Sequence, residues 1–114
     1  MHEGAIVNSL LQIAERSKEE AGLATVSTVR IAVGRLHHIV DEVMQAHFDI
    51  MKQNIAGFEN ASLVTETREI KLKCDNCGKT ITIDEPVFSC KACGCLSTRI
   101  ISGDELHIIT IEGS

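Results

Sequence analysis

Two Cys-x-x-Cys pairs constrain this chain more than any other feature of its sequence. The first is Cys74–Cys77 and the second is Cys90–Cys93, with twelve residues between the pairs. Two such knuckles can hold four thiolates around one ion at about 2.3 Å, which is the arrangement of a structural zinc site. The spacing therefore predicts a zinc ribbon. Its predicted ligands are Cys74, Cys77, Cys90 and Cys93.

The same thiols are compatible with a disulfide pair, a redox-active dithiol or a rubredoxin-like iron centre. Thiolate ligands alone do not separate zinc from iron, although an iron-loaded electron carrier would be coloured on purification. The chain has five cysteines among 114 residues. Because the count is odd and the pairs have knuckle spacing, we expect reduced thiols in a cytoplasmic protein rather than a secreted disulfide scaffold.

The ribbon is predicted to span residues 68–101. This segment has few large apolar residues, and pieces below about 40 residues usually need a metal or a disulfide to fold. Structural zinc can supply roughly 10–16 kcal/mol of apparent free energy. Gly78 and Gly94 follow the two knuckles and allow the chain to turn through left-handed backbone angles. We expect the ribbon to unfold without metal.

Hydrophobic periodicity predicts two helices and about three strands in the rest of the chain. The helices are expected at residues 4–21 and 40–55, with Gly22 and Gly57 as their exits. The strands are expected at 28–33, 62–67 and 106–111, with turns at Gly34 and Gly103. The predicted fold class is α/β (α+β): two helices packed on a small sheet of about three strands, with an inserted four-cysteine zinc ribbon. The predicted domains are an α/β domain of residues 1–67 completed by 102–114, and the ribbon of residues 68–101.

Charge and composition argue against several functions. The net charge is -5; residues 68–101 carry +2 and the remainder carries -7. An acidic body without Trp or Tyr is a poor surface for nucleic-acid backbones. The chain lacks a Ser-His-Asp set, a phosphate loop and a dinucleotide fingerprint, so we do not expect an enzyme. It also lacks an export signal and an apolar run near the roughly 18 residues of a membrane span, which favours the cytoplasm.

The first three residues form a second candidate site. The amine of Met1, the amide and imidazole of His2 and the amide of Glu3 are neighbouring nitrogen donors. Such a set suits Ni²⁺ or Cu²⁺, which accept planar donors, better than Zn²⁺, which has no such preference. A Met-His start alone is weak support, because many chains begin this way by chance.

Taken together, the Met1–Glu3 start leading into a helix, the α/β layer, the paired knuckles and the final strand after Gly103 resemble the HypA/HybF family. These proteins are nickel metallochaperones of hydrogenase maturation, and the resemblance covers nearly the whole chain. It implies that His2 is a nickel ligand, with Met1 and Glu3 contributing main-chain nitrogen. It implies zinc at the four knuckle cysteines, and it makes Asp41 a further candidate at the nickel end.

The resemblance also implies partners. They are a HypB-type GTPase, the large subunit of nickel-iron hydrogenase and, in some bacteria, urease accessory proteins; we expect a monomer or weak dimer. The alternative function is a zinc-ribbon interaction module that binds nucleic acid or a transcription complex. That alternative rests on the same four cysteines and on the +2 charge of the ribbon.

Several residues remain outside these sites. Cys95 is a fifth thiol that is either a free surface cysteine or a sensor of metal and oxidation. His37 and His38 are expected to be a solvated loop pair, with assistance to nickel as the alternative. His47 lies on the apolar stripe of the second predicted helix and is expected to be a partly buried packing residue. His107 is given no role.

Overall fold

The computed structural model describes residues 2–85 and 87–114. The regular elements, in chain order, are α1 (Glu3–Ala21), β1 (Val26–Gly34), η1 (Arg35–His37), α2 (Asp41–Met51), η2 (Lys52–Asn54), β2 (Ser62–Arg68), β3 (Ile70–Cys74), β4 (Thr80–Ile83), β5 (Thr98–Ser102) and β6 (Leu106–Gly113). The strands form two three-stranded sheets, with orders β2-β1-β6 and β4-β3-β5. Within the described residues, no helix has both the length and the apolar character needed to cross a membrane.

The chain forms two compact units. The first consists of Met1–Ala32, Ile39–Glu66 and His107–Ser114, and the second consists of Val33–His38 and Thr67–Leu106. The short segment Val33–His38 therefore belongs with the unit that holds the cysteines.

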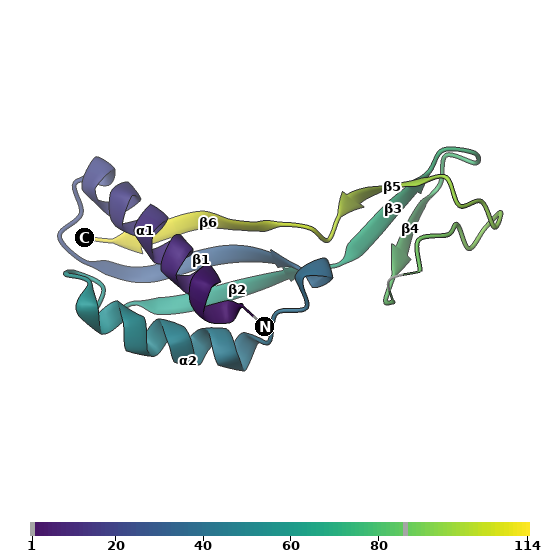
Figure 1. Cartoon of the computed structure of the whole chain (residues 1–114). Helices are drawn as coiled ribbons and strands as arrows, with labels where there is room; N and C mark the ends of the chain where they lie inside the picture. Colours follow the sequence, from purple (N-terminus) through teal and green to yellow (C-terminus); the bar gives the residue numbers. More distant parts are fainter. Residues whose placement is uncertain (1, 86) are drawn as a thin grey trace. The chain divides into compact units, whose positions relative to one another are not determined.

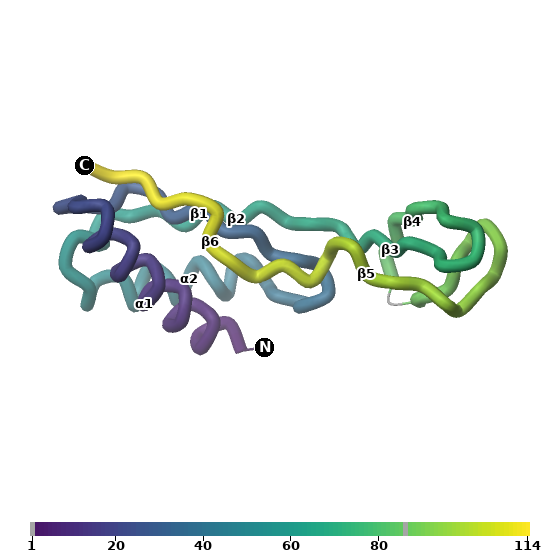
Figure 2. The backbone as a smooth tube through the Cα atoms, turned by 90° about the horizontal axis from the view of Figure 1, so that it is seen from above, coloured from purple at the N-terminus to yellow at the C-terminus, as the bar shows by residue number. Residues whose placement is uncertain are grey.

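The first unit is a helical layer on a sheet. Both helices lie on the same side of the β2-β1-β6 sheet (Figures 1 and 2). Strand β1 is the central strand of this sheet, and it is buried at Val26, at Val29 and continuously from Ile31 to Gly34. The buried side chains include Val7, Leu11, Val29, Ile31, Met44 and Phe48. The predicted architecture of two helices on a small three-stranded sheet is confirmed.

The predicted end of the second helix is wrong. The α-helix stops at Met51, continues as a single 3-10 turn over Lys52–Asn54, and Ile55 is extended with φ -119° and ψ 119°. The apolar spacing continues to Ile55, but the chain must turn earlier to bring Phe58 into the core, where its side chain is fully buried. The burial of a phenylalanine thus outweighs the local helical pattern.

The second unit is built on a sheet that the sequence patterns did not predict. The central strand β3 pairs antiparallel with β4, where Ile70 faces Ile83, and with β5, where Leu72 faces Ile100. Ile70, Leu72 and Ile83 form the buried cluster, and Leu36 of η1 packs against it. This core is small, in line with the expectation that the ribbon needs a metal to fold.

Gly34 and Gly103 meet at a close backbone contact in the second unit. A Cβ on Gly34 would lie 2.1 Å from the carbonyl oxygen of Gly103, and Gly103 has φ +106°. The same carbonyl accepts a 2.9 Å hydrogen bond from the Leu36 amide. The predicted turn at Gly103 is confirmed, and both positions require glycine for steric reasons.

Candidate metal centre

The first knuckle follows directly from strand β3. Cys74 is the last residue of β3, and its sulfur accepts hydrogen bonds from the backbone amides of Asn76 and Cys77, both at 3.4 Å. The Gly78 amide then donates to the Cys74 carbonyl at 3.0 Å, with φ +72° at the glycine. The turn therefore folds back over its first sulfur and presents both cysteines on the same side.

The second knuckle repeats this turn without a preceding strand. The Gly94 amide donates to the Cys90 carbonyl at 2.7 Å, and Gly94 has φ +76°. The Cys90 amide donates to the carbonyl of Cys95 at 2.8 Å, which closes the turn from the other side. The predicted left-handed role of the two glycines after the knuckles is confirmed.

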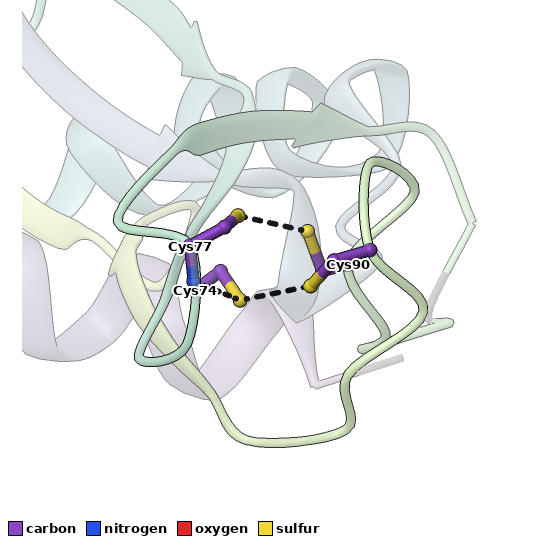
Figure 3. A group of neighbouring side chains, drawn as sticks. Cys74, Cys77 and Cys90 are labelled. Carbon is purple, nitrogen blue, oxygen red and sulfur yellow. Dashed lines mark hydrogen bonds between the residues drawn. The ribbon is translucent and has the colours of Figure 1, made fainter.

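The four knuckle sulfurs converge on one point. All of them lie within 4.8 Å of one another. Cys74 Sγ is 3.6 Å from Cys93 Sγ, and Cys77 Sγ is 3.6 Å from Cys90 Sγ. Figure 3 shows the sulfurs of Cys74, Cys77 and Cys90 directed toward a common centre. Within residues 2–85 and 87–114, no other group of three or more His, Cys, Asp or Glu side chains converges in this way.

These distances fit a tetrahedral metal site. A tetrahedron with metal–sulfur bonds of about 2.3 Å has sulfur–sulfur edges of about 3.8 Å, close to the two 3.6 Å separations. All five cysteines are free. Cys74 and Cys90 are buried whereas Cys77 and Cys93 are exposed, so each knuckle contributes one inner and one outer sulfur. The four thiols can therefore hold one metal ion with little rearrangement.

Hydrogen bonding and burial shift the pKa values of three of the knuckle thiols in different directions. The amide of Cys77 donates to Cys74, which lowers the pKa of the Cys74 thiol to about 6 against the opposing effect of burial. A hydrogen bond from the Lys79 amide acts to lower the pKa of Cys77, but desolvation and the neighbouring thiols outweigh it and raise that pKa to about 11. Burial opposes ionisation of Cys90, but hydrogen bonds led by the Cys93 amide produce a net lowering of the Cys90 pKa. Thiolate, the form that binds metal, is thus favoured at the inner sulfur of each knuckle.

Cys95 stands apart from this cluster. Its side chain is half-buried, and its sulfur accepts a hydrogen bond from the Ser97 amide at 3.3 Å. It does not belong to the group of converging sulfurs. The structure thus gives Cys95 a local turn contact and does not place it among the four.

The N-terminal candidates lie where the two helices begin. Met1 falls outside the described residues. His2 is the exposed N-cap of α1, and its carbonyl accepts the Ile6 amide at 3.0 Å. Glu3 is buried, and its carboxylate accepts a 3.1 Å hydrogen bond from the amide of Val40, the N-cap of α2.

Asp41 begins α2 immediately after Val40. Its carboxylate is exposed and accepts a 2.8 Å hydrogen bond from the Thr65 hydroxyl. Because the preceding amide binds Glu3, the start of α2 lies beside the start of α1. His2, Glu3 and Asp41 do not converge within the described residues in the way that the cysteines do.

The remaining histidines are not among the predicted ligands, and one of them differs from expectation. His37 and His38 are exposed, and Nε2 of His37 is 2.9 Å from the carbonyl oxygen of Asp104. His107 is exposed on β6. The expected burial of His47 is wrong: it is exposed, although its ring lies against Gly4. The buried residues of α2 are Met44 and Phe48, and His47 lies outside that buried face.

Comparison with known proteins gives a consistent result over the full chain. The family model described as "Hydrogenase/urease nickel incorporation, metallochaperone, hypA" matches residues 1–113. The hydrogenase maturation factor HypA of Aquifex aeolicus is 33 % identical over 112 residues, which cover 98 % of this chain and 96 % of that protein. The HypA of Campylobacter jejuni is 30 % identical over 111 residues, with 97 % of each chain covered.

Two solved structures have the same fold as this chain. The solution structure of the nickel metallochaperone HypA from Helicobacter pylori has a TM-score of 0.73 at 18 % identity, covering 99 % of this chain and 97 % of that one. A second solution structure of a HypA protein has a TM-score of 0.75 at 18 % identity, and the match covers 100 % of this chain and 97 % of that one. From the match to its family model over residues 1–113, the chain belongs to the HypA family of nickel metallochaperones of hydrogenase maturation.

Proposed function

We propose that this protein binds Ni(II) at its N-terminus and delivers it during maturation of nickel-iron hydrogenase, with urease as a second recipient in cells that make it. The observation that carries the proposal is the position of His2: it is exposed at the N-cap of α1, at the start of a chain that matches the family model from its first residue. The proposed nickel donors are Met1, His2 and Glu3, with Asp41 as a further candidate.

The contact between the two helix starts supports this site. The Glu3 side chain is engaged with the Val40 amide, so Glu3 has its main-chain nitrogen rather than its carboxylate to offer a metal. The same contact brings Asp41 to the N-terminal end of the unit, where its carboxylate is held by Thr65. A carboxylate and an imidazole near a terminal amine are suitable donors for a metal that is to be released again.

We propose that the four knuckle cysteines bind zinc, which stabilises the ribbon of residues 68–101, while residues 1–67 and 102–114 form the nickel domain. Zinc in four thiolates is a closed structural site with no open position. The nickel site has a different requirement, because a nickel ion that is delivered to another protein must be able to leave its site. Exposure of His2 and the small number of protein donors at the N-terminus favour exchange of nickel with a recipient.

The proposed partners follow from the family. They are a HypB-type GTPase and the hydrogenase large subunit, with urease accessory proteins where urease is the recipient, and the proposed location is the cytoplasm. We propose that the chain has no enzymatic activity of its own. Delivery then depends on the partner that removes nickel from His2, not on chemistry in this chain.

A titration with Ni²⁺ tests the proposal. Zinc-loaded protein that begins at Met1 is compared with a version that carries one extra N-terminal residue, which blocks the amine chelate. We expect only the unextended protein to take up one nickel, seen as the visible absorption of nitrogen-bound Ni²⁺. We also expect His2→Ala to abolish this uptake and to retain zinc. Equal nickel binding by the extended protein or by His2→Ala would refute the assignment.

A specific feature of the ribbon favours the alternative, a nucleic-acid interaction module. Lys71 and Lys73 are both exposed on β3, and Lys73 lies opposite Arg99 on β5. Arg99 is paired with Asp75 at 2.9 Å, which reduces the positive charge of this face. Measurement of binding to a DNA or RNA oligonucleotide at two salt concentrations separates the functions, since a phosphate-binding ribbon loses affinity steeply with salt.

A further inference from the structure

His47 lies against the first turn of α1 with its nitrogen-bearing edge toward the helix. A methyl group placed on Gly4 would be 3.1 Å from Cε1 of His47, 3.3 Å from Nδ1 and 3.6 Å from Nε2. Cε1 is the carbon between the two ring nitrogens, so both possible metal-binding atoms face the backbone at residue 4. This position is one residue from Glu3 and two from His2.

Gly4 permits this approach. A side chain at residue 4 would meet the ring at 3.1 Å, which is closer than ordinary van der Waals contact. The positions of Gly4 and His47 therefore depend on each other, because the absence of a Cβ leaves the room that the imidazole occupies.

The imidazole is not otherwise engaged. Within residues 2–85 and 87–114, His47 makes no hydrogen bond and no ion pair, and its side chain is exposed. Its neighbours one turn away on α2 are Val43 and Ile50, which are 40 % and 70 % exposed and carry no charge. The ring is exposed and lies against the first turn of α1, the helix whose N-cap is His2.

We propose that His47 is a further nickel ligand, which adds a second imidazole to the donors of the first three residues. This inference rests on the proposed function, since it assigns another residue to the same nickel site. Imidazole nitrogen is a suitable donor for Ni²⁺. Because His47 lies in α2, a bound nickel ion would link the start of α1 to the middle of α2, whereas the Glu3–Val40 hydrogen bond links the starts of the two helices.

Ni²⁺ titration of zinc-loaded full-length protein, with imidazole ¹⁵N resonances recorded by NMR, tests the proposal. One equivalent of nickel should shift or broaden the His47 ring resonances together with those of His2. His47→Gln should weaken nickel binding by about tenfold or more, a loss typical for groups that support a metal site. Gly4→Ala should weaken it as well, because the added methyl pushes the ring away without removing it. His107→Gln, an exposed histidine on β6, is the matched control and should bind nickel like the unmodified protein.

The outcomes separate this proposal from the proposed function. The role of His47 is overturned if its ring resonances do not change at one equivalent of nickel. It is also overturned if His47→Gln binds nickel as tightly as the control. In both of these cases His2→Ala still abolishes nickel binding, so the proposed function stands. If His2→Ala binds nickel normally, the proposed function itself fails. Should His47→Gln fail to fold, the resonances of the unmodified protein decide the question.

Discussion

The backbone amide of Val40 donates a 3.1 Å hydrogen bond to Oε2 of Glu3, which joins the start of α2 to the start of α1. Glu3 is the one buried charged residue in the described part of the chain, at 5 % exposure. The amides at the start of a helix lack partners within the helix, so a carboxylate from another element is a favourable acceptor. A residue expected to contribute only its main-chain nitrogen thus has a structural role for its side chain as well.

Replacement of Glu3 tests this structural role. Glu3→Ala leaves the Val40 amide without its acceptor and should lower the midpoint of thermal unfolding by several degrees. Glu3→Gln keeps a side-chain oxygen and should lower it less. Both variants should still bind one nickel, because the proposed donor is the main-chain nitrogen. Equal midpoints for the Ala variant and the unmodified protein would show that the hydrogen bond does not stabilise the unit.

Gly34→Ala tests the close contact between β1 and the turn at Gly103. The new methyl group would lie 2.1 Å from the Gly103 carbonyl oxygen, so backbone must move, and we expect a loss of about 1–3 kcal/mol or more. Gly22→Ala is the control. Its new methyl group would have no atom within 4 Å, so the loss of stability comes only from the backbone φ of +70° and should be about 1–2 kcal/mol. Urea unfolding of the two variants gives both free energies, and a smaller loss for Gly34→Ala than for Gly22→Ala contradicts the steric argument.

The sequence was most informative where local chemistry determines structure. The knuckle spacing predicted the cysteine cluster, the left-handed turns at Gly78 and Gly94 follow from the same motif, and the amphipathic periodicity predicted α1 to within one residue. The helix and the two turns depend on neighbours a few residues away, and the cluster depends on two such local motifs that share one kind of ligand. A single sequence contains such information directly.

Features that depend on distant contacts were missed. The end of α2 depends on the burial of Phe58, and the exposure of His47 depends on which face of α2 packs in the core. The ribbon sheet did have a signal: Ile70, Leu72 and Cys74 alternate with two lysines, the period-2 pattern of a strand with one buried face. The hydrogen bond that the Val40 amide donates to the Glu3 carboxylate joins residues 37 apart and has no local signal.

Metal removal should affect the two units differently. In the described part of the ribbon the buried hydrophobic cluster consists of Ile70, Leu72 and Ile83, and without zinc such a small core should not hold. We expect a chelator to raise hydrogen exchange at the Leu72 amide to that of an unfolded chain while the Ile31 amide in β1 stays protected. Retained protection of Leu72 in metal-free protein would show that the ribbon folds without its ion.

Single cysteine variants test which thiols hold the metal. Cys74→Ser removes a sulfur of the converging group and should reduce bound zinc from one equivalent to near zero. Cys95→Ser removes the thiol outside that group and should keep full zinc. Metal analysis of the purified variants gives the answer, and loss of zinc from Cys95→Ser would revise the ligand set.

Asp41 offers a test of the nickel site that leaves the first three residues intact. Its carboxylate is held by the Thr65 hydroxyl at 2.8 Å, next to the residue that bonds to Glu3. If Asp41 supports nickel, Asp41→Asn should weaken Ni²⁺ binding by about tenfold, the lower range for loss of a supporting group, because the amide keeps the hydrogen bond to Thr65 but lacks the negative charge. Glu42→Gln, the adjacent exposed acid, is the matched control for charge and should leave the affinity unchanged. Equal weakening by both variants would mean that nickel responds to the general negative charge of this end, and Asp41 would then lose its specific role.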